Sequence, residues 1–325
     1  NFMIAFEKPD FTIAHTVAKE IKALDEHKTF RQIPARTSTK LLVASWNLAN
    51  FGLQKRQVTH FEMMAHIIQY FDVVALQEIA DDIRDLEKLM NILGSNYDCV
   101  YSDIGGNLER GAYIYDSTKV SRKGLVAELV IKSNREREIE IAVGEVVEKK
   151  SFFDYNRNPY MVNFQAKAFD FTLVNVHLYW SSEFLRSAEV NALGKWAKNR
   201  SALAEYKPPS KDIILLGDFN MPSFEDDDPI YKPIKSYGFK APLHETSNTE
   251  GSNLAGDQFY DQIFFLPKHV DDSFSGKIGV FDFDNAVFKK FWDQNEDSKT
   301  GRIKFHQYIR YYLSDHRPLW AQFDI

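Results

Sequence analysis

Two polar residues, Asp218 and Asn220, follow a short apolar run and have side chains that can bind a cation or a water molecule. Residues 213–216 are Ile-Ile-Leu-Leu, and Gly217 and Pro222 bracket the turn that ends this run. A short apolar run between turn residues is typical of a strand buried on both faces. Open α/β sheets bind ligands just beyond the carboxyl ends of such strands. An Asx turn would be the preferred interpretation if this pair stood alone.

The same arrangement recurs along the chain, with Asn, Asp, Glu or His beside predicted buried strands. The further positions are Asn47, Glu78, His177, Asp261, Asp315 and His316. Carboxylate and amide oxygens suit Mg²⁺ or Mn²⁺, and histidines titrate near neutral pH. Each residue alone has an ordinary explanation in a turn, a helix start or a structural histidine. Together they predict metal-assisted hydrolysis of a phosphate ester, with two histidines as acid and base.

The elements that position these residues alternate between strands and helices, which predicts an α/β fold. Strands are predicted at residues 41–45, 72–76, 112–115, 124–131, 138–147, 159–166, 171–176, 213–216, 260–266 and 319–325. Helices are predicted at residues 58–68, 82–93 and 182–200 from the 3.6-residue spacing of their apolar positions. The strands at 124–131 and 138–147 are expected to form a hairpin around the charged residues 134–137.

Residues 1–39 are expected to form an N-terminal helical extension and linker, ahead of a catalytic domain at residues 40–325. The helix is predicted at residues 12–30, with Leu24 on its apolar face and Glu20 on its solvent face. Residues 32–40 are predicted to be a linker. Packing on the main domain is the default expectation for the helix, and contact with a partner is the alternative.

Composition sets limits on location and partners. The chain has 325 residues, of which 44% are hydrophobic, and a formal net charge of −6. This charge disfavours tight non-specific nucleic-acid binding but is compatible with a nuclease that releases its product. Cys99 is the single cysteine, so no intrachain disulfide can form, and no apolar run approaches membrane-spanning length. Both a cytoplasmic and a secreted location stay open, since a removed signal peptide would leave no trace.

Six ordered motifs resemble those of the endonuclease/exonuclease/phosphatase superfamily, and the deoxyribonuclease I-like branch is the most similar. They are WNLANFG (46–52), LQE (76–78), NVHL (175–178), GDFN (217–220), YDQIFF (260–265) and SDHRPL (314–319). Glu109-Arg110 and the segment YNRNP (155–159) resemble further features of that branch. The resemblance covers residues 41–325 and implies a four-layered α/β sandwich, in which helices flank two packed mixed β-sheets.

The resemblance also implies a metal site. Glu78 would be the principal ligand of Mg²⁺, or alternatively Mn²⁺. Asn47 and Asp315 would complete the metal and phosphate site through oxygen atoms or bound water. Asp218 and Asn220 would orient the nucleophilic water and hold a phosphate oxygen.

The two histidines would carry protons on opposite sides of the phosphorus. His316 would be a general base oriented by Asp261, and His177 a general acid oriented by Glu109. Which ring is the acid and which the base stays open at this point. A carboxylate behind each imidazole is expected to raise its pKa. Arg157 would contact the scissile phosphate.

Three positions differ from the deoxyribonuclease pattern and concern DNA binding. Ala49 and Ala80 stand where arginines are expected, and Asn107 where a groove-inserting aromatic residue is expected. Possible substitutes are Lys55, Arg56, Arg84 and Arg186, for which solvated surface charge is the favoured interpretation. A second open question is whether an aromatic-rich segment covers the site or adds to the core. Its residues are Phe281, Phe283, Phe288, Phe291 and Trp292.

The sequence therefore predicts a monomeric, Mg²⁺-dependent phosphodiester hydrolase. A DNA endonuclease is the first expectation, with DNA preferred over RNA as the nucleic-acid substrate. The alternative is a phosphatase or phosphodiesterase acting on a small molecule, a lipid headgroup or RNA. A non-catalytic binding module is disfavoured because every expected catalytic position carries a competent residue.

Overall fold

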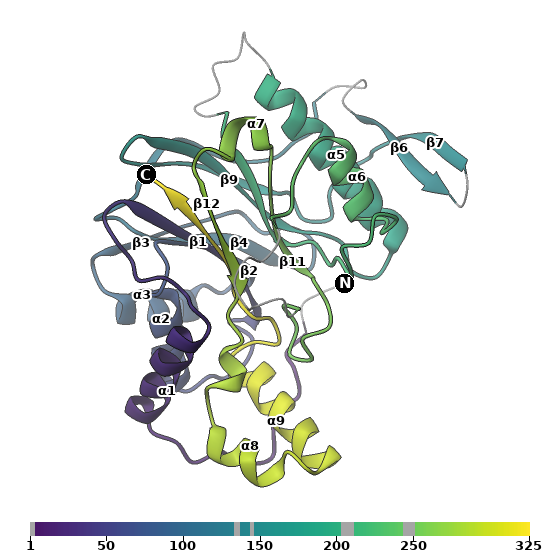
Figure 1. The fold of residues 1–325 in the computed structure, drawn as a ribbon. Coiled ribbons are helices and arrows are strands. Elements are labelled where there is room, and N and C mark those ends of the chain that lie inside the picture. Colours follow the sequence, from purple (N-terminus) through teal and green to yellow (C-terminus); the bar gives the residue numbers. More distant parts are fainter. Residues whose placement is uncertain (1–3, 133–136, 144–145, 203–210, 243–250) are drawn as a thin grey trace.

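The computed structural model has two mixed β-sheets packed face to face, with helices on both outer faces (Figure 1). The expected four-layered α/β sandwich is confirmed. The structure describes residues 4–132, 137–143, 146–202, 211–242 and 251–325.

The first sheet has six strands in the order β12-β13-β1-β2-β4-β3. Neighbours β1 and β2 run parallel, and the other neighbours are antiparallel. Its strands are β1 (Lys40–Phe51), β2 (Val73–Ala80), β3 (Tyr97–Tyr101), β4 (Glu109–Asp116), β12 (Phe274–Val280) and β13 (Leu319–Asp324). Strands β3 and β12 are absent from the sequence prediction.

The second sheet has five strands in the order β11-β10-β9-β8-β5, and β9 and β10 run parallel. Its strands are β5 (Ser121–Glu128), β8 (Tyr160–Ala166), β9 (Phe169–His177), β10 (Ile213–Asp218) and β11 (Asp261–Phe265). The predicted hairpin between 124–131 and 138–147 is wrong. Strand β5 pairs with β8, whereas β6 (Glu138–Val143) pairs with β7 (Val146–Ser151) in a separate hairpin. The expected turn at 134–137 lies largely outside the described residues.

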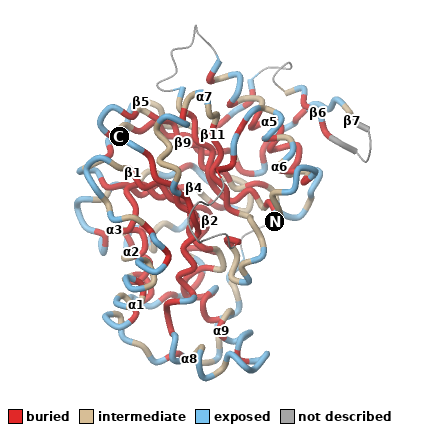
Figure 2. The backbone as a smooth tube through the Cα atoms, in the orientation of Figure 1, coloured by how far each residue is buried: buried red, intermediate tan, exposed pale blue. Residues whose placement is uncertain are grey.

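The alternation of side chains along the central strands creates the layers. Leu41 and Val43 of β1 join the core between the sheets, whereas Leu42 and Ala44 join the core under the helices. Residues 213–216 of β10 alternate in the same way, so this strand is buried on both faces as predicted. Figure 2 shows the central strands as the buried interior of the molecule. Each large aliphatic side chain so buried stabilises the fold by about 2 kcal/mol.

The helices cover opposite faces of the sandwich (Figure 1). Apolar residues of α1, α2, α3 and α9 belong to the core on the outer face of the first sheet, and those of α5 and α6 to the core on the second. None of the described helices is long and apolar enough to cross a membrane. The helices are α1 (Val17–Phe30), α2 (Val58–Ile68), α3 (Arg84–Leu93), α5 (Glu183–Ala202), α6 (Tyr231–Ser236), α7 (Pro267–Val270), α8 (Lys289–Asn295) and α9 (Lys299–Tyr312).

The N-terminal segment packs on the rest of the described chain. Helix α1 begins at Val17 rather than at residue 12, and the expected solvent position of Glu20 is wrong. The Glu20 carboxylate is buried and accepts a hydrogen bond from the backbone N–H of Phe288 at 2.7 Å. Within the expected linker, the Arg36 guanidinium donates to Asp72 at 2.6 Å. These contacts hold both parts of the segment against the first sheet and its helices.

The aromatic-rich segment adds to the core and does not line the cleft described below. Phe281, Phe283 and Phe288 are buried in the core beneath α1 and α2, and Phe291 and Trp292 pack against it. Helix α9 within this region is absent from the sequence prediction, since its apolar side chains are mostly aromatic and interrupted by charges. Ser298 caps α9 by accepting a hydrogen bond from Gly301 N at 3.2 Å.

The burial of His60 is expected to make the stability of the protein depend on pH. Burial lowers the pKa of His60 from 6.5 to about 3. Its Nδ1 accepts the Gln57 N–H at 3.3 Å, which requires the neutral ring. Since the unfolded chain binds this proton more tightly, stability is full above pH 6.5 and falls as the pH drops toward 3.

We expect His60→Asn, which keeps an acceptor but cannot titrate, to flatten this dependence. Between pH 6.5 and 5 the wild type should lose roughly 2 kcal/mol more free energy of unfolding than the variant. Urea titrations at several pH values measure the two slopes. Parallel slopes would contradict the prediction, whatever the absolute stabilities.

Candidate active site

Strand pairing brings several predicted site residues to one edge of the sandwich. Asp218, the last residue of β10, lies opposite His177 at the end of the parallel strand β9 and opposite Asp261 at the start of the antiparallel strand β11. In the first sheet, Glu109 begins β4 opposite Ala80 at the end of β2. Strand β10 also contacts β1 and β2 across the sandwich. Parallel strands that end at this edge and antiparallel strands that begin there therefore contribute to a single site.

Backbone irregularities turn Glu78 and its neighbours toward this edge. The register between β1 and β2 shifts between Asn47 and Phe51, and that between β2 and β4 shifts between Leu76 and Ile79. Glu78 itself has φ +58°, a left-handed conformation that is costly for a residue with a β-carbon. Such bulges re-aim side chains, and they are common beside active sites.

Asp218 lies between the two predicted catalytic histidines. Its Oδ2 is 3.6 Å from Nε2 of His177 and 3.7 Å from Nε2 of His316. Asn47 Nδ2 donates to the same oxygen at 3.1 Å and to Glu78 Oε1 at 3.0 Å. The backbone N–H of Asn220 donates to the other Asp218 oxygen at 2.8 Å.

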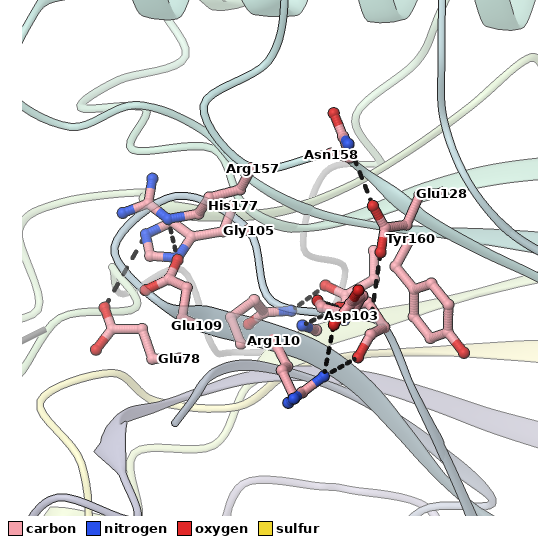
Figure 3. A pocket seen from close by; sticks show the side chains of 14 residues that line it. Glu78, Asp103, Gly105, Glu109, Arg110, Glu128, Arg157, Asn158, Tyr160 and His177 are labelled. Carbon is pink, nitrogen blue, oxygen red and sulfur yellow. Dashed lines mark hydrogen bonds and ion pairs between the residues drawn. The ribbon is translucent and has the colours of Figure 1, made fainter. Parts of the chain in front are cut away.

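A carboxylate lies behind each imidazole, as the resemblance implied. Nδ1 of His316 is 2.8 Å from Oδ2 of Asp261, and Nδ1 of His177 is 2.7 Å from Oε1 of Glu109. The Arg157 guanidinium also pairs with Oε1 of Glu109. Figure 3 shows Arg157, Glu109, His177 and Glu78 gathered at one side of a pocket.

The loop that carries His316 is fixed from two sides. The Ser314 hydroxyl donates to the Asn47 carbonyl at 2.6 Å and accepts the His316 N–H at 2.9 Å. The Trp46 indole donates to the His316 carbonyl at 2.8 Å. Ser314 and Trp46 thus position the ring through its backbone, a role that their motifs alone did not reveal.

These groups surround a cleft of about 650 Å³. Asn47 and Asp261 stand behind its wall through the hydrogen bonds described above. Every site residue predicted from the sequence is therefore at the cleft or in contact with a residue that lines it. The predicted residues that line it are Glu78, Glu109, Arg157, His177, Asp218, Asn220, Asp315 and His316.

A model of the endonuclease/exonuclease/phosphatase family matches residues 44–265 of the chain. The chain belongs to this family. The family comprises hydrolytic phosphoesterases. Membership in it therefore supports a phosphodiesterase or phosphatase activity. A bovine relative, endonuclease/exonuclease/phosphatase family domain-containing protein 1, is 30% identical over 128 residues, which are 38% of this chain and 22% of that protein. The chain thus spans about a fifth of this relative's length.

Three solved structures show the same fold. A mannosyl-6-phosphatase of Bacteroides thetaiotaomicron has a TM-score of 0.55 at 17% identity, covering 87% of this chain and 99% of that one. The human nocturnin catalytic domain with bound sulfate anion scores 0.53 at 15% identity, covering 89% and 96%. Truncated Caenorhabditis elegans TDP2 scores 0.53 at 17% identity, covering 88% and 98%. At these identities the likeness concerns the fold alone.

Within this family fold, the pKa values of the two histidines shift in opposite directions. Burial lowers the pKa of His316, but the carboxylates of Asp261 and Asp218 outweigh it and hold the pKa well above the ordinary value. Burial and the Arg157 guanidinium lower the pKa of His177 from 6.5 to about 4. The expectation of a raised pKa is therefore supported for His316 and wrong for His177. The reasons are the burial of His177 and the positive charge of Arg157, which also pairs with Glu109 behind the ring.

The residues around Glu78 fit a divalent cation. Glu78 is partly exposed at the cleft, and its Oε2 accepts the Asn50 N–H at 2.7 Å, which fixes the carboxylate. Asp315 lines the same cleft and offers a second carboxylate. Asn47 presents its amide nitrogen to Glu78, while its oxygen accepts the Ala49 N–H at 2.9 Å. This geometry supports a positioning role for Asn47, and direct ligation by its oxygen stays a prediction.

A second set of ligand atoms lies close together but fits a cation less well. Atoms of Glu78, Glu109 and His177 lie within 4.8 Å of one another. Glu109, however, already pairs with both His177 and Arg157, and burial raises its pKa to about 7. A carboxylate shared with a guanidinium is a weaker cation ligand, so we place the candidate metal at Glu78 and Asp315.

The departures from the deoxyribonuclease pattern leave few basic groups at the cleft. Ala49 and Ala80 are buried, and Asn107 lines the cleft. Solvated surface charge is the wrong interpretation for Arg56, which is buried and donates to the carbonyls of Leu48, Ala49 and Leu313. Arg186 donates to the carbonyls of residues 179 and 180. Arg56 therefore stabilises the backbone of nearby loops and does not face a substrate.

Glu189 is a site residue that the sequence analysis missed. This buried side chain of α5 accepts the N–H of Asn156 at 2.7 Å and that of Tyr179 at 2.8 Å. It thereby ties the loop of Arg157 to the loop that follows His177. Burial raises its pKa to about 7. A lone glutamate in a helical pattern gives no local signal of such a role.

The metal assignment predicts a loss of cation binding in Glu78→Gln. With Mg²⁺ or Mn²⁺ at about one hundred times its dissociation constant, the wild type should gain about 2.7 kcal/mol of stability, seen as a rise in melting temperature. The variant should lose most of this gain because glutamine removes the charge but keeps the shape. Glu87→Gln, at an exposed position of α3, is the matched control and should respond like the wild type. An undiminished response in Glu78→Gln would contradict the assignment.

Proposed function

We propose that this protein is a divalent-cation-dependent phosphodiesterase acting on nucleic acid, with DNA cut endonucleolytically as the expected reaction. One observation carries the proposal: two imidazoles, each backed by a carboxylate, flank Asp218 at 3.6 and 3.7 Å, and Glu78 lies 4.0 Å from His177 Nε2. Family membership supports the hydrolysis of a phosphate ester. The nucleic-acid substrate and the choice of Mg²⁺ go beyond family membership and are proposed here.

In the proposed reaction, an in-line displacement, each side chain of the cleft has its own role. Asp218 and Asn220 orient a water molecule for attack, and Arg157 holds non-bridging phosphate oxygens. One imidazole accepts a proton from the water, and the other protonates the leaving oxygen. A cation at Glu78 and Asp315 would supply neutralisation of the charge that develops on phosphate oxygens.

The difference between the imidazoles supports an assignment of their roles. His177, whose pKa is lowered, is the better proton acceptor from the water, and His316, whose pKa is raised, is the better proton donor to the leaving oxygen. This order is the reverse of the roles that the resemblance implied. Replacement of either ring by alanine should lower kcat by about 10²–10⁴-fold.

A plasmid assay tests the proposed function. Incubation with Mg²⁺ should convert supercoiled DNA to nicked and then linear forms, and a chelator should prevent this. His177→Ala and His316→Ala should each slow nicking by the factor given above, while His269→Ala, on the short helix α7, should nick like the wild type. Intact plasmid at high enzyme concentration, with RNA also uncut, would reject the nucleic-acid substrate.

A second candidate is a phosphatase or phosphodiesterase of small phosphate esters. It is favoured by the scarcity of basic residues, since Arg157 is the sole lysine or arginine among the described residues that line the cleft. The mannosyl-6-phosphatase of similar fold shows that the sandwich can serve a small substrate. Release of phosphate from sugar phosphates or inositol phosphates, with plasmid left intact, would establish this candidate. No release from such a panel would remove it.

A further inference from the structure

A second pocket, mostly apolar, opens beside the catalytic cleft and is not used by the chemistry above. It lies between the β6–β7 hairpin and α5 and has a volume of about 570 Å³, within the ~300–1,000 Å³ range of small-molecule sites. Buried side chains form its interior: Ile139, Ile141, Phe152 and Tyr155. At its rim the aromatic rings are open to solvent, with Phe153 88% and Phe184 48% exposed.

The pocket and the cleft share two chain segments. Asn156 lines the pocket, and the next residue, Arg157, lines the cleft. Tyr179 lines the pocket, and its neighbour Trp180 lines the cleft with 60% of its surface exposed. Because consecutive Cα atoms are about 3.8 Å apart, a ligand group in the pocket is within reach of a phosphate in the cleft.

Glu189 links the two segments that the pocket and the cleft share. Its carboxylate, which lines the pocket, accepts the backbone N–H groups of Asn156 and Tyr179 at 2.7 and 2.8 Å. Both shared segments are thus anchored on α5. The spacing between a phosphate at Arg157 and a group in the pocket is therefore set by the fold.

We propose that this pocket binds an unpaired nucleobase of a single-stranded nucleic acid whose phosphate occupies the catalytic cleft. The proposal rests on the proposed function and names the substrate class of that site. Bases stack on aromatic side chains, and exposed rings are present at both sites, with Trp180 at the cleft and Phe153 and Phe184 at the pocket. A base held there would place its sugar-phosphate beside Arg157 and His177.

The lining discriminates among possible occupants. Ser151, Asp154 and Asn156 at the pocket offer hydrogen-bonding groups that a base edge can use and an acyl chain cannot. A duplex keeps its bases stacked and is held by lysine and arginine contacts to phosphates along both strands. The described cleft lining provides Arg157 alone for such contacts. These features favour a flexible single strand over a duplex or a lipid surface.

Kinetics with a short fluorophore–quencher oligonucleotide, as a single strand and as the matching duplex, test the proposal. The wild type should cut the single strand with the higher kcat/KM. Combined substitution of Trp180→Ala and Phe184→Ala should raise KM for the single strand by about tenfold or more, with a smaller change in kcat. Phe184→Tyr, which keeps a ring, should restore binding relative to Phe184→Ala. Phe30→Ala, an exposed aromatic on α1, is the matched control and should be unchanged.

Other measurements separate failure of the pocket from failure of the proposed function. Methyl 4-nitrophenyl phosphate reports hydrolysis without a nucleobase, and the ratio of kcat/KM for oligonucleotide over this ester should fall in the double variant. An unchanged ratio, or equal or faster cutting of the duplex, would overturn the base subsite and leave the phosphodiesterase standing. If neither substrate is hydrolysed, quenching of tryptophan fluorescence by the single strand decides: quenching supports the subsite, and its absence overturns it. Co-sedimentation with phosphatidylcholine vesicles, lost in Phe153→Ala, would replace the nucleobase by a lipid.

Discussion

The buried carboxylate of Asp218 is the constraint on which the arrangement of the cleft depends. A charged group removed from water must be surrounded by donors or positive charge, or it becomes protonated. Here the donors are the amide of Asn47 at 3.1 Å and the N–H of Asn220 at 2.8 Å, while the two imidazoles lie at 3.6 and 3.7 Å. These groups come from distant parts of the chain. The same convergence that satisfies the carboxylate also assembles the groups that can activate water and carry protons.

The architecture explains why the convergence occurs at one edge. Parallel pairs at the centre of each sheet end there, and antiparallel neighbours begin there, so Glu109 and Asp261 arrive beside Glu78, His177 and Asp218. Register shifts then turn side chains out of the regular alternation of β1 and β2. The strained backbone at this edge is held by the core on both sides of each sheet. In a regular sheet without these shifts, the Glu78 carboxylate would not be directed toward this edge.

The environment also gives two similar histidines different properties. Each ring is largely buried, with a carboxylate at Nδ1 and Asp218 near Nε2, but the carboxylate behind His177 is shared with Arg157, whereas Asp261 hydrogen-bonds to His316. The pKa of the first ring is therefore lowered, and that of the second is raised. In such a pair, acid and base roles follow from the charges around the rings and not from their position in a motif. The apolar pocket beside them likewise depends on how the hairpin and α5 pack.

The sequence by itself determined which residue types follow which strands, and with them the fold class, the candidate site residues and the family of hydrolytic phosphoesterases. These are local properties, since apolar runs, turn residues and short polar motifs can be recognised without knowing their neighbours in space. Only the tertiary structure decided the burial of Glu20 and Arg56, the pairing of β5 with β8, the link made by Glu189 and the lowered pKa of His177. Each depends on contacts between distant segments, because burial and nearby charge, which set hydrogen bonding and proton affinity, are created by packing.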